Sequence, residues 1–307
     1  MNLFHDIAAL PDNLRGGAVS IGNFDGVHRG HARIVERLVA RAREVGGPSL
    51  VFTFDPHPVR LLRPNHAPPP LTWTDRKAQL LAELGVDGIL AYPTDLELLG
   101  LPAADFFRRI VIDQLQARAM VEGPNFFFGH DRQGNVTTLA SLSAASGVQL
   151  EIVEPMEIDG RIVSSSRVRQ SIAAGLVDEA RHCLTRPYRI RGMVTHGAKR
   201  GAKLGFPTAN IEAVDTLVPG PGVYAGRAII GTAIWPAAIH IGPIPTFGDH
   251  SHKVEVHLIG FDGSLYGSPL EVDFLSRLRD VRPFANVEEL KTQLRHDVAA
   301  AKELFQP

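Results

Sequence analysis

The sequence has very little cysteine, no long apolar run and no excess of either charge. Cys183 is the only cysteine, so an intrachain disulfide is excluded. No apolar stretch approaches the roughly 18 residues of a membrane span, and the N-terminus has no secretion-signal pattern. Lys plus Arg number 32 against 33 Asp plus Glu, which favours neither a nucleic-acid-binding nor a membrane-binding surface. We therefore expect a cytoplasmic protein that binds small anions locally. The sequence does not indicate the oligomeric state.

The composition is that of an ordinary globular protein, with 44% hydrophobic and 21% charged residues among 307. This length predicts two domains. In the first part of the chain, strand-like and helix-like segments alternate, as expected for a parallel sheet that is covered by helices on both faces. The predicted strands are 17–22, 49–54, 86–92, 118–123 and 149–155, and the predicted helices are 31–45, 74–84 and 102–115.

A helix predicted at 167–184 ends this alternation, and we place the domain boundary just after it, which gives domains 1–185 and 186–307. The second domain is rich in Gly and Pro and has short alternating runs, which indicate an antiparallel barrel or a sandwich. A final helix, predicted at 287–305, has apolar residues at helical spacing that should pack against this sheet. The alternating runs are 223–229, 237–242 and 253–261, and the apolar residues of the helix are Val287, Leu290, Leu294 and Val298.

The segment 21–35 carries an H-x-G-H motif at the point where a strand is followed by a helix. Free backbone N–H groups and the helix dipole favour a phosphate at such a point. His28 and His31 are three residues apart and can donate hydrogen bonds to one anion. Such a site suits nucleotidyl transfer, in which a substrate phosphate is the nucleophile and the protein positions two polyanions. The alternative is structural, with His28 in a loop and His31 as a helix cap.

A second group of phosphate-binding side chains lies in the segment 161–170. Its serines, at 164–166, are typical of a helix start, and Arg161, Arg167 and Arg169 offer bidentate donors to phosphate. A serine run before a helix is also consistent with a simple cap. Together with the histidine turn, the segment is predicted to clamp a triphosphate.

Four motifs occur in a specific order along this half of the chain. They are G-x-F-D-G-V-H-x-G-H at 22–31, V-F-T-F-D-P-H-P at 51–58, G-P-N-F-F-F-G-H-D-R-Q-G at 123–134 and V-S-S-S-R-V-R at 163–169. With them the chain resembles the bifunctional bacterial riboflavin kinase/FAD synthetase family over nearly its full length. The resemblance implies that residues 1–185 form an FMN adenylyltransferase domain with a Rossmann-like, H-x-G-H nucleotidyltransferase fold.

The same resemblance implies the site residues of this domain, with His28 and His31 as catalytic residues. An isoalloxazine ring needs flat apolar partners, which the aromatic run 126–128 offers, although that run is equally consistent with a buried strand. Asn125 stands where the family usually has Asp, and Ser166 where it usually has Thr, and both retain hydrogen bonding. ATP is expected to meet Gly22, Asn23, His28, His31, Arg161, Ser164 and Arg169, and FMN to meet Phe54, Asp55, Pro56, His57, Pro58, Asn125, Phe126 and Phe128.

The segment 192–210 is rich in Gly and Lys and is suited to covering phosphates. It is not a Walker A motif, because no G-K-[ST] ends it, and a generic loop of this kind is also consistent with a hairpin turn. Its G-F-P-T-A-N sequence, at 205–210, resembles the signature of the riboflavin kinase family. The resemblance implies that residues 186–307 form a riboflavin kinase, an antiparallel β-barrel with a terminal helix.

For the kinase the resemblance implies Glu255 as the base that accepts the proton of a ribityl hydroxyl, and Arg279 as a flavin-binding residue. The alternative for Glu255 is a solvent-facing position on an alternating strand. The chain departs from the family around one turn, where the family commonly has Asn at the positions of His240 and Ile244. The isoleucine removes amide donors and acceptors that would fix the substrate loop. Kinase-bound ATP is expected to meet Gly197, Lys203, Gly205, Phe206, Thr208 and Asn210, with Thr208 and Asn210 also holding Mg²⁺.

These inferences favour a bifunctional enzyme that uses ATP and Mg²⁺ to convert riboflavin to FMN and FMN to FAD. Riboflavin, FMN and ATP are the expected small-molecule partners, with FMN and FAD as product or substrate. Two alternatives stay open at this point. One is an enzyme in which only the adenylyltransferase site is active, and the other is a flavin-binding regulatory protein without turnover.

Overall fold

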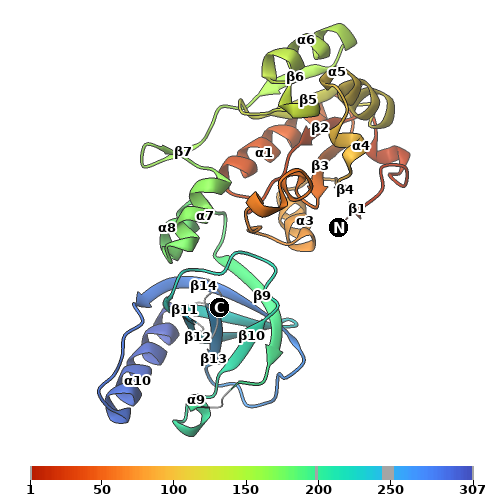
Figure 1. Cartoon of the computed structure of the whole chain (residues 1–307). Coiled ribbons are helices and arrows are strands. Elements are labelled where there is room, and N and C mark those ends of the chain that lie inside the picture. Colours follow the sequence, from red (N-terminus) through yellow and green to blue (C-terminus); the bar gives the residue numbers. More distant parts are fainter. Residues whose placement is uncertain (1, 198–199, 244–251, 306–307) are drawn as a thin grey trace. The chain divides into compact units, whose positions relative to one another are not determined.

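The computed structural model of the chain describes residues 2–197, 200–243 and 252–305 (Figure 1). They form two compact units. The first contains the chain up to Pro68 together with Trp73–Ser164, and the second contains Pro69–Thr72 together with the chain from Ser165 onward. Compactness thus assigns the helices that follow Ser165 to the second unit. The functional domain boundary at 185/186 stays a prediction.

The first unit is built on a six-stranded parallel sheet with strand order β1-β4-β3-β2-β5-β6. All five predicted strands are present. The sixth, β1, was not predicted, because a strand of two residues has no detectable alternation. The strands are β1 (Leu3–Phe4), β2 (Ala18–Ile21), β3 (Ser49–Asp55), β4 (Gly88–Pro93), β5 (Ala119–Glu122) and β6 (Gln149–Ile152).

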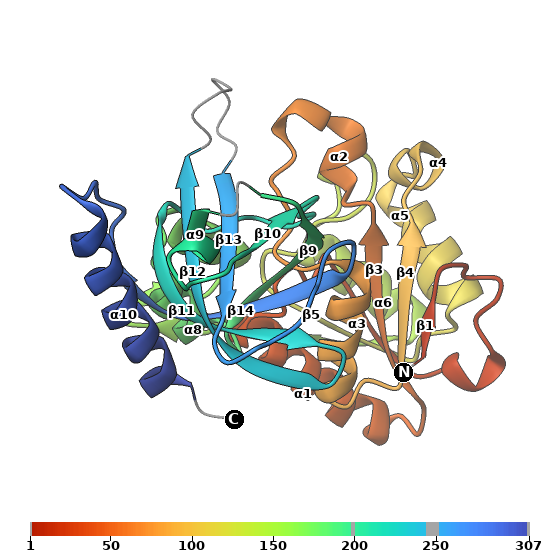
Figure 2. The same ribbon diagram turned by 90° about the horizontal axis from the view of Figure 1, so that it is seen from below.

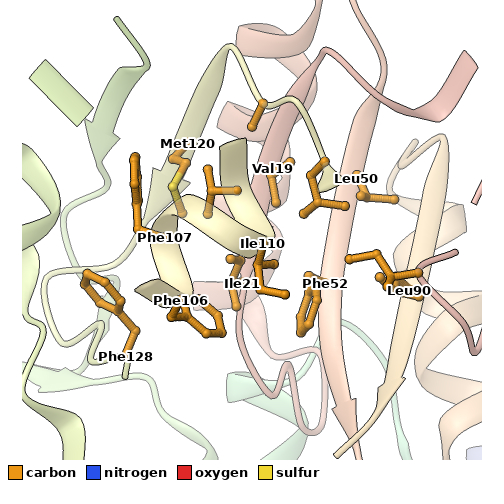
Figure 3. Packing of buried hydrophobic residues seen from close by; sticks show 14 of the residues in the cluster. Val19, Ile21, Leu50, Phe52, Leu90, Phe106, Phe107, Ile110, Met120 and Phe128 are labelled. Carbon is orange, nitrogen blue, oxygen red and sulfur yellow. The ribbon is translucent and has the colours of Figure 1, made fainter. Parts of the chain in front are cut away.

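Helices cover both faces of this sheet, as the alternating pattern predicted. On one face, α1 (Arg29–Glu44) and α3 (Thr74–Glu83) pack against strands through one apolar cluster. On the other face, α5 (Ala103–Phe106) continues into a π-helix (Phe107–Gln114), which lies across the strands with Phe107 and Ile110 facing them (Figure 3). The remaining elements are α2 (Pro58–Leu62), α4 (Leu96–Leu99), α6 (Val136–Ser146), 3₁₀ turns at Asp12–Leu14, Pro64–His66 and His130–Arg132, and a small hairpin of β7 (Glu157–Ile158) and β8 (Arg161–Ile162).

The helix predicted at 167–184 is two helices, α7 (Ser165–Ala173) and α8 (Val177–Cys183), so the prediction of one helix was wrong. Gly175 separates them with φ of +74°, a left-handed conformation that ends a helix. Its N–H donates to Ile172 O at 2.9 Å. A Cβ at this glycine would lie 2.5 Å from the hydroxyl of Tyr224, so close packing also requires glycine here. The apolar spacing continues through the break, which is why it predicted one helix.

The second unit is a closed antiparallel barrel with strand order β10-β13-β12-β11-β14-β9 (Figure 2). Closure decides between the barrel and the sandwich that the sequence left open. Inward side chains such as Ile190, Val256 and Phe274 are fully buried, and they alternate with outward polar residues. The elements are β9 (Tyr188–Thr195), α9 (Arg200–Lys203), β10 (Ala209–Glu212), β11 (Gly222–Ile230), β12 (Ala233–Pro243), β13 (His252–Leu258) and β14 (Pro269–Arg279).

The terminal helix α10 (Val287–Leu304) lies against β11 and β12, as predicted (Figure 2). Its contact is made by Ala301 and Val298, which pack on Ala225. The prediction that Val287 packs there was wrong, because this first residue of the helix is 53% exposed. Among the described residues, no helix is both long and apolar enough to cross a membrane.

Glu122, at the end of β5, is a buried acid in the middle of the parallel sheet. It is 3% exposed, and its Oε1 accepts a hydrogen bond from the N–H of Ile21 at 2.7 Å. Burial raises the pKa of Glu122 well above its ordinary value of 4.5. The folded protein therefore keeps this carboxyl neutral at a pH where the unfolded chain ionises it, and stability is lost as pH rises above 4.5 toward the raised pKa.

We expect Glu122→Gln to be more stable than the unchanged chain at about pH 8, with the advantage shrinking toward about pH 5. Glutamine keeps an oxygen for the Ile21 N–H and has no charge to bury. Thermal unfolding across this pH range, compared with the exposed control Glu157→Gln, measures the effect. A pH-independent difference would show that Glu122 does not change its ionisation on folding.

Candidate functional site

The H-x-G-H turn lies at the topological switch point of the parallel sheet. Strands follow one another outward from β2 through β3 and β4 on one side and through β5 and β6 on the other. The crevice at such a point is where open α/β sheets bind ligands. The helix α1 begins there, so its free N–H groups face the predicted phosphate site.

The backbone between Gly22 and His28 is held in an unusual conformation that sequence reasoning did not detect. Phe24 and Val27 have φ of +45° and +38°, and Gly26 has φ of +83°. Positive φ is strained for a bulky and above all for a β-branched residue. Both apolar side chains are buried, at 3% and 0% exposure, so core packing holds the strained turn in place.

His28 and His31 are brought together at the start of α1. His28 caps the helix, because its Nδ1 accepts a hydrogen bond from the backbone N–H of His31 at 3.2 Å. The two rings stack with centroids 3.6 Å apart. Since Nδ1 of His28 is an acceptor, the proton of the neutral ring is on Nε2. The structure thus makes His28 the cap, whereas the structural alternative had given this role to His31.

Desolvation is the main cause that holds the pKa of His31 well below its ordinary value of 6.5, and the nearby positive charge of Lys77 adds to it. His31 is therefore neutral at physiological pH. Its Nδ1 is buried and has no hydrogen-bond partner among the described residues. The Oδ1 atom of Asn23 is in the same situation. Buried polar atoms without partners are expected where a ligand completes the site.

The structure brings the segment before α7 to this turn. A Cβ added at Gly30 would lie 3.4 Å from the carbonyl oxygen of Val163, which directly precedes Ser164. Arg161 is exposed on the β7–β8 hairpin of the same unit. Arg169 belongs to the second unit, where its Nε donates to Pro69 O at 3.1 Å. The assignment of these residues to ATP stays a prediction.

The predicted FMN-binding residues belong to two segments of the first unit, the end of β3 with the start of α2 and the segment 125–128. Asp55 ends β3 and accepts a hydrogen bond from the Thr74 hydroxyl at 2.7 Å. His57 caps α2 through Nδ1, and Pro58 is its first residue. Phe54 is partly buried against the core, and the cis peptide Asp55–Pro56 lies between these groups.

The aromatic run 126–128 forms no extended strand, so the buried-strand alternative was wrong in form, although part of the run is core. Phe128 is 6% exposed and packs on Phe106 with ring centroids 6.0 Å apart. Phe126 stacks on Phe128 at 5.3 Å and is partly accessible, and Asn125 is exposed. Phe126 is therefore better placed than Phe128 to contact a flavin, and both assignments stay predictions.

In the second unit, four polar residues follow one another across the outer face of the barrel. Strand register places Thr195 beside Asn210, Asn210 beside Glu255, and Glu255 beside His240. Sequence reasoning missed Thr195, because a threonine on a strand carries no signal of its own. Buried oxygens of Thr195 (Oγ1) and Asn210 (Oδ1) have no hydrogen-bond partner among the described residues. The row therefore presents hard oxygen ligands next to a carboxylate.

Glu255 is held as a carboxylate by two neighbours. His240 Nδ1 lies 3.4 Å from its Oε2, and Lys253 Nζ donates to its Oε1 at 2.6 Å. The hydrogen bond from His240, followed by Lys253, lowers the pKa of Glu255 to about 2. The residue is only partly exposed, so the alternative of a simple solvent-facing glutamate does not describe it. His240 replaces the family's amide with another hydrogen-bonding group, and Ile244 lies outside the described residues.

The Gly-rich loop approaches Asn210 closely. A Cβ added at Gly197 would lie 2.0 Å from Asn210 Nδ2. Gly205 has φ of +88°, and Lys203 is exposed on α9. The ring of Phe206 lies 5.7 Å from that of His257. Thr208, two residues before Asn210, is partly buried.

We expect Gly197→Ala to lower kcat/KM for riboflavin phosphorylation by about 10²-fold, because displacement of a reacting geometry by about 1 Å has this effect. The new methyl group would displace Asn210 or the loop. The formation of FAD from added FMN by the same preparation is the internal control. Equal phosphorylation rates for Gly197→Ala and the unchanged chain would show that the close approach of Gly197 to Asn210 has no part in the reaction.

Arg279 lines a cavity of about 470 Å³ between the end of β14 and α10. Its guanidinium is paired with the buried carboxylate of Asp297, with Nη2 and Oδ2 2.7 Å apart. Gln293 donates a further hydrogen bond to Asp297 at 2.9 Å. Arg279 is therefore fixed in place at the cavity, and its contact with a flavin stays a prediction.

The donor set of the barrel fits a magnesium ion shared with a nucleotide. The described residues contain no group of three or more His, Cys, Asp or Glu side chains able to hold a metal alone. Mg²⁺ is typically bound by one or two protein oxygens together with substrate phosphates and water. Asn210 Oδ1 has no hydrogen-bond partner within the described ranges and suits that role, with Thr195 beside it on the neighbouring strand.

Comparisons with known proteins cover both units. A model of the FAD synthetase family matches residues 10–167, and a model of the riboflavin kinase family matches residues 184–305. A bifunctional riboflavin kinase/FMN adenylyltransferase from Pseudomonas fluorescens is 41% identical over 308 residues, covering 100% of this chain and 99% of the relative. One of the same description from Escherichia coli (strain K12) is 33% identical, covering 98% and 96%.

A solved structure has the same fold. The crystal structure of a protein from Streptococcus pneumoniae, titled a macrolide-efflux protein, has a TM-score of 0.87 and 28% identity, and the match covers 98% of each chain. Each family model includes the motif that its unit's site is built on, the H-x-G-H turn in one and the G-F-P-T-A-N loop in the other. Because the curated relatives also match from one end of this chain to the other, the chain belongs to the bifunctional riboflavin kinase/FMN adenylyltransferase family.

Proposed function

We propose that the chain phosphorylates riboflavin to FMN in the barrel and transfers an adenylyl group to FMN in the parallel-sheet unit, forming FAD. The observation that carries the proposal is that one chain contains both families' matches, each over a unit with its own site. ATP is the second substrate of both reactions. We further propose that the enzyme works in the cytoplasm on these small molecules, without a nucleic-acid or membrane partner.

In the kinase reaction, the oxygen of a ribityl hydroxyl bonds to the γ-phosphorus of ATP, and the bond to ADP breaks. Glu255 is ionised, so it can orient the hydroxyl and accept its proton as the new bond forms. Mg²⁺, when bound, neutralises charge on the phosphates. Asn210 and Thr208 are proposed to hold it, and Thr195 is added to this set because of its unpartnered oxygen.

In the adenylyltransferase reaction, a phosphate oxygen of FMN bonds to the α-phosphorus of ATP, and pyrophosphate leaves. The N-terminus of α1 and the Nε2–H group of His28 stabilise the charge that moves onto pyrophosphate. His31 acts as a neutral hydrogen-bonding group. No protein nucleophile is needed, since the attacking phosphate is already ionised.

The experiment is a time course of the full chain with riboflavin, ATP and Mg²⁺, in which flavins are separated by chromatography. FMN should appear first and FAD afterwards. A second reaction that starts from FMN distinguishes an enzyme with only the adenylyltransferase site active, which would form FAD from FMN but leave riboflavin unchanged. A chain that binds flavins and forms neither product would instead be a regulatory protein.

A further inference from the structure

Lys77, on α3, is a buried cation that lies beside the H-x-G-H turn. The adenylyltransferase reaction described above assigns it no role. It is the only lysine in the first 198 residues, where arginine otherwise supplies the basic side chains. It is 7% exposed, and its ammonium group donates to Thr53 Oγ1 at 3.2 Å. Lysine has three donors, and this is its one hydrogen bond to any residue that the structure describes.

The bond to Thr53 continues into the strained turn. The Thr53 hydroxyl has one proton and donates it to the carbonyl oxygen of Asn23 at 3.1 Å. Its oxygen lone pairs then accept the hydrogen bond from Lys77. The two hydrogen bonds therefore run in one direction, from the ammonium to the hydroxyl and from the hydroxyl to the carbonyl. Asn23 directly precedes Phe24, whose φ is +45°. Strained backbone persists only where its surroundings hold it, and this relay is one such restraint.

Two carboxylates act on the charge of Lys77 without a direct ion pair among the described residues. The carboxylates of Asp25 and Asp55 act on it electrostatically, but Lys77 forms no ion pair with any described residue. Burial lowers the pKa of Lys77 and the two aspartates raise it. Without Lys77, the two carboxylates would repel the polyphosphate that the turn is built to bind. A buried ammonium is therefore both a restraint on the turn and an offset to its acidic neighbours.

We propose that Lys77 is a positioning residue for adenylyl transfer, acting through Thr53 on the Asn23 carbonyl to hold the turn that receives the ATP phosphates. The inference rests on the proposed adenylyltransferase function. A positioning role differs from a purely structural one, because burying a lysine by itself lowers the stability of the fold. Methionine has a similar volume and no charge, so Lys77→Met removes the ammonium group and leaves the carboxylates of Asp25 and Asp55 without its compensation, which lowers stability. A loss of activity that persists well below the melting temperature of the variant is thus the signature of positioning.

The test is a double-mutant cycle of Lys77→Met and Thr53→Val, with FAD formation from FMN as the assay. Each single variant should lower kcat by about 10²-fold, because small misplacements of reacting groups have effects of this size. The double variant should be no slower than the slower single one, since both changes break the same relay. Rates are compared at a temperature well below the melting temperature of each variant, so that a loss of stability does not lower them. Riboflavin phosphorylation should be unchanged in every variant, and Lys302→Met, at an exposed position on α10, is the matched control.

Wild-type rates of FAD formation in Thr53→Val would overturn the proposal, and this variant decides it alone if Lys77→Met fails to fold. Multiplying effects in the double variant would also overturn it, because the residues would then act independently. Wild-type rates in both single variants when they are assayed well below their melting temperatures would show a structural role. Absence of FAD formation by the unchanged chain would instead refute the proposed adenylyltransferase function.

Discussion

His31→Ala should lower the rate of FAD formation from FMN by about 10²- to 10³-fold, the usual effect of removing one hydrogen-bonding group that stabilises charge in a transition state. His31 stacks on His28 at the N-terminus of α1, and its buried Nδ1 has no hydrogen-bond partner in the part of the chain that the structure describes. Phosphorylation of riboflavin should continue at the rate of the unchanged chain. Chromatography of the flavin products from riboflavin and from FMN measures both rates in one preparation.

The matched control is His5→Ala, which removes an exposed histidine of the same unit. Because the pKa of His31 lies well below 6.5, its protonation should not reduce FAD formation between about pH 8 and pH 6.5. Equal losses of both activities in His31→Ala would contradict the assignment of the two reactions to different units. Full FAD formation would remove His31 from the site.

Glu255→Gln should lower riboflavin phosphorylation by about 10²- to 10⁴-fold, the range typical of a positioned acid–base group. Glutamine keeps the shape of the side chain and cannot accept the proton of the attacking hydroxyl. The substitution also removes the carboxylate charge that pairs with Lys253 and His240. FAD formation from supplied FMN should be unaffected. Initial rates with each flavin substrate give the two numbers.

Glu212→Gln, at an exposed position on β10, is the control for this substitution. The pKa of Glu255 is lowered from 4.5 to about 2, so the side chain stays ionised well below pH 4.5. Its ion pairs therefore contribute fully to stability above pH 4.5, and this contribution is lost as the pH falls toward 2. Phosphorylation should therefore show no loss from protonation of Glu255 down to about pH 5. Full kinase activity in Glu255→Gln would require a different base.

Periodicity predicted the parallel sheet and its helices well, because period 2 and period 3.6 patterns are properties of local sequence. It failed where a single residue interrupts a pattern without changing it. Gly175 divides one predicted helix into two, and Val287 lies at a position of the right spacing but is exposed. The spacing predicts which side of a helix is apolar and does not predict where the partner surface ends.

The site was predicted from motifs, and its unpredicted parts come from long-range contacts. Thr195 is proposed as a site residue only because strand register places it beside Asn210, on another strand. Lys77 is likewise 24 residues from Thr53, and a lysine in an amphipathic helix is read as exposed. His240 and Glu255 are paired across the neighbouring strands β12 and β13. The sequence showed His240 only as a departure from the family's usual Asn, and this contact explains how it can act on Glu255.

Residue identity and spacing were enough to predict the two-part organisation, the order of the motifs and the family. Barrel closure, the ionisation of Glu255 and the strain and restraint of the H-x-G-H turn became visible in the folded structure. Closure, pKa and strain depend on which groups desolvate and contact one another, and residues distant in sequence make those contacts.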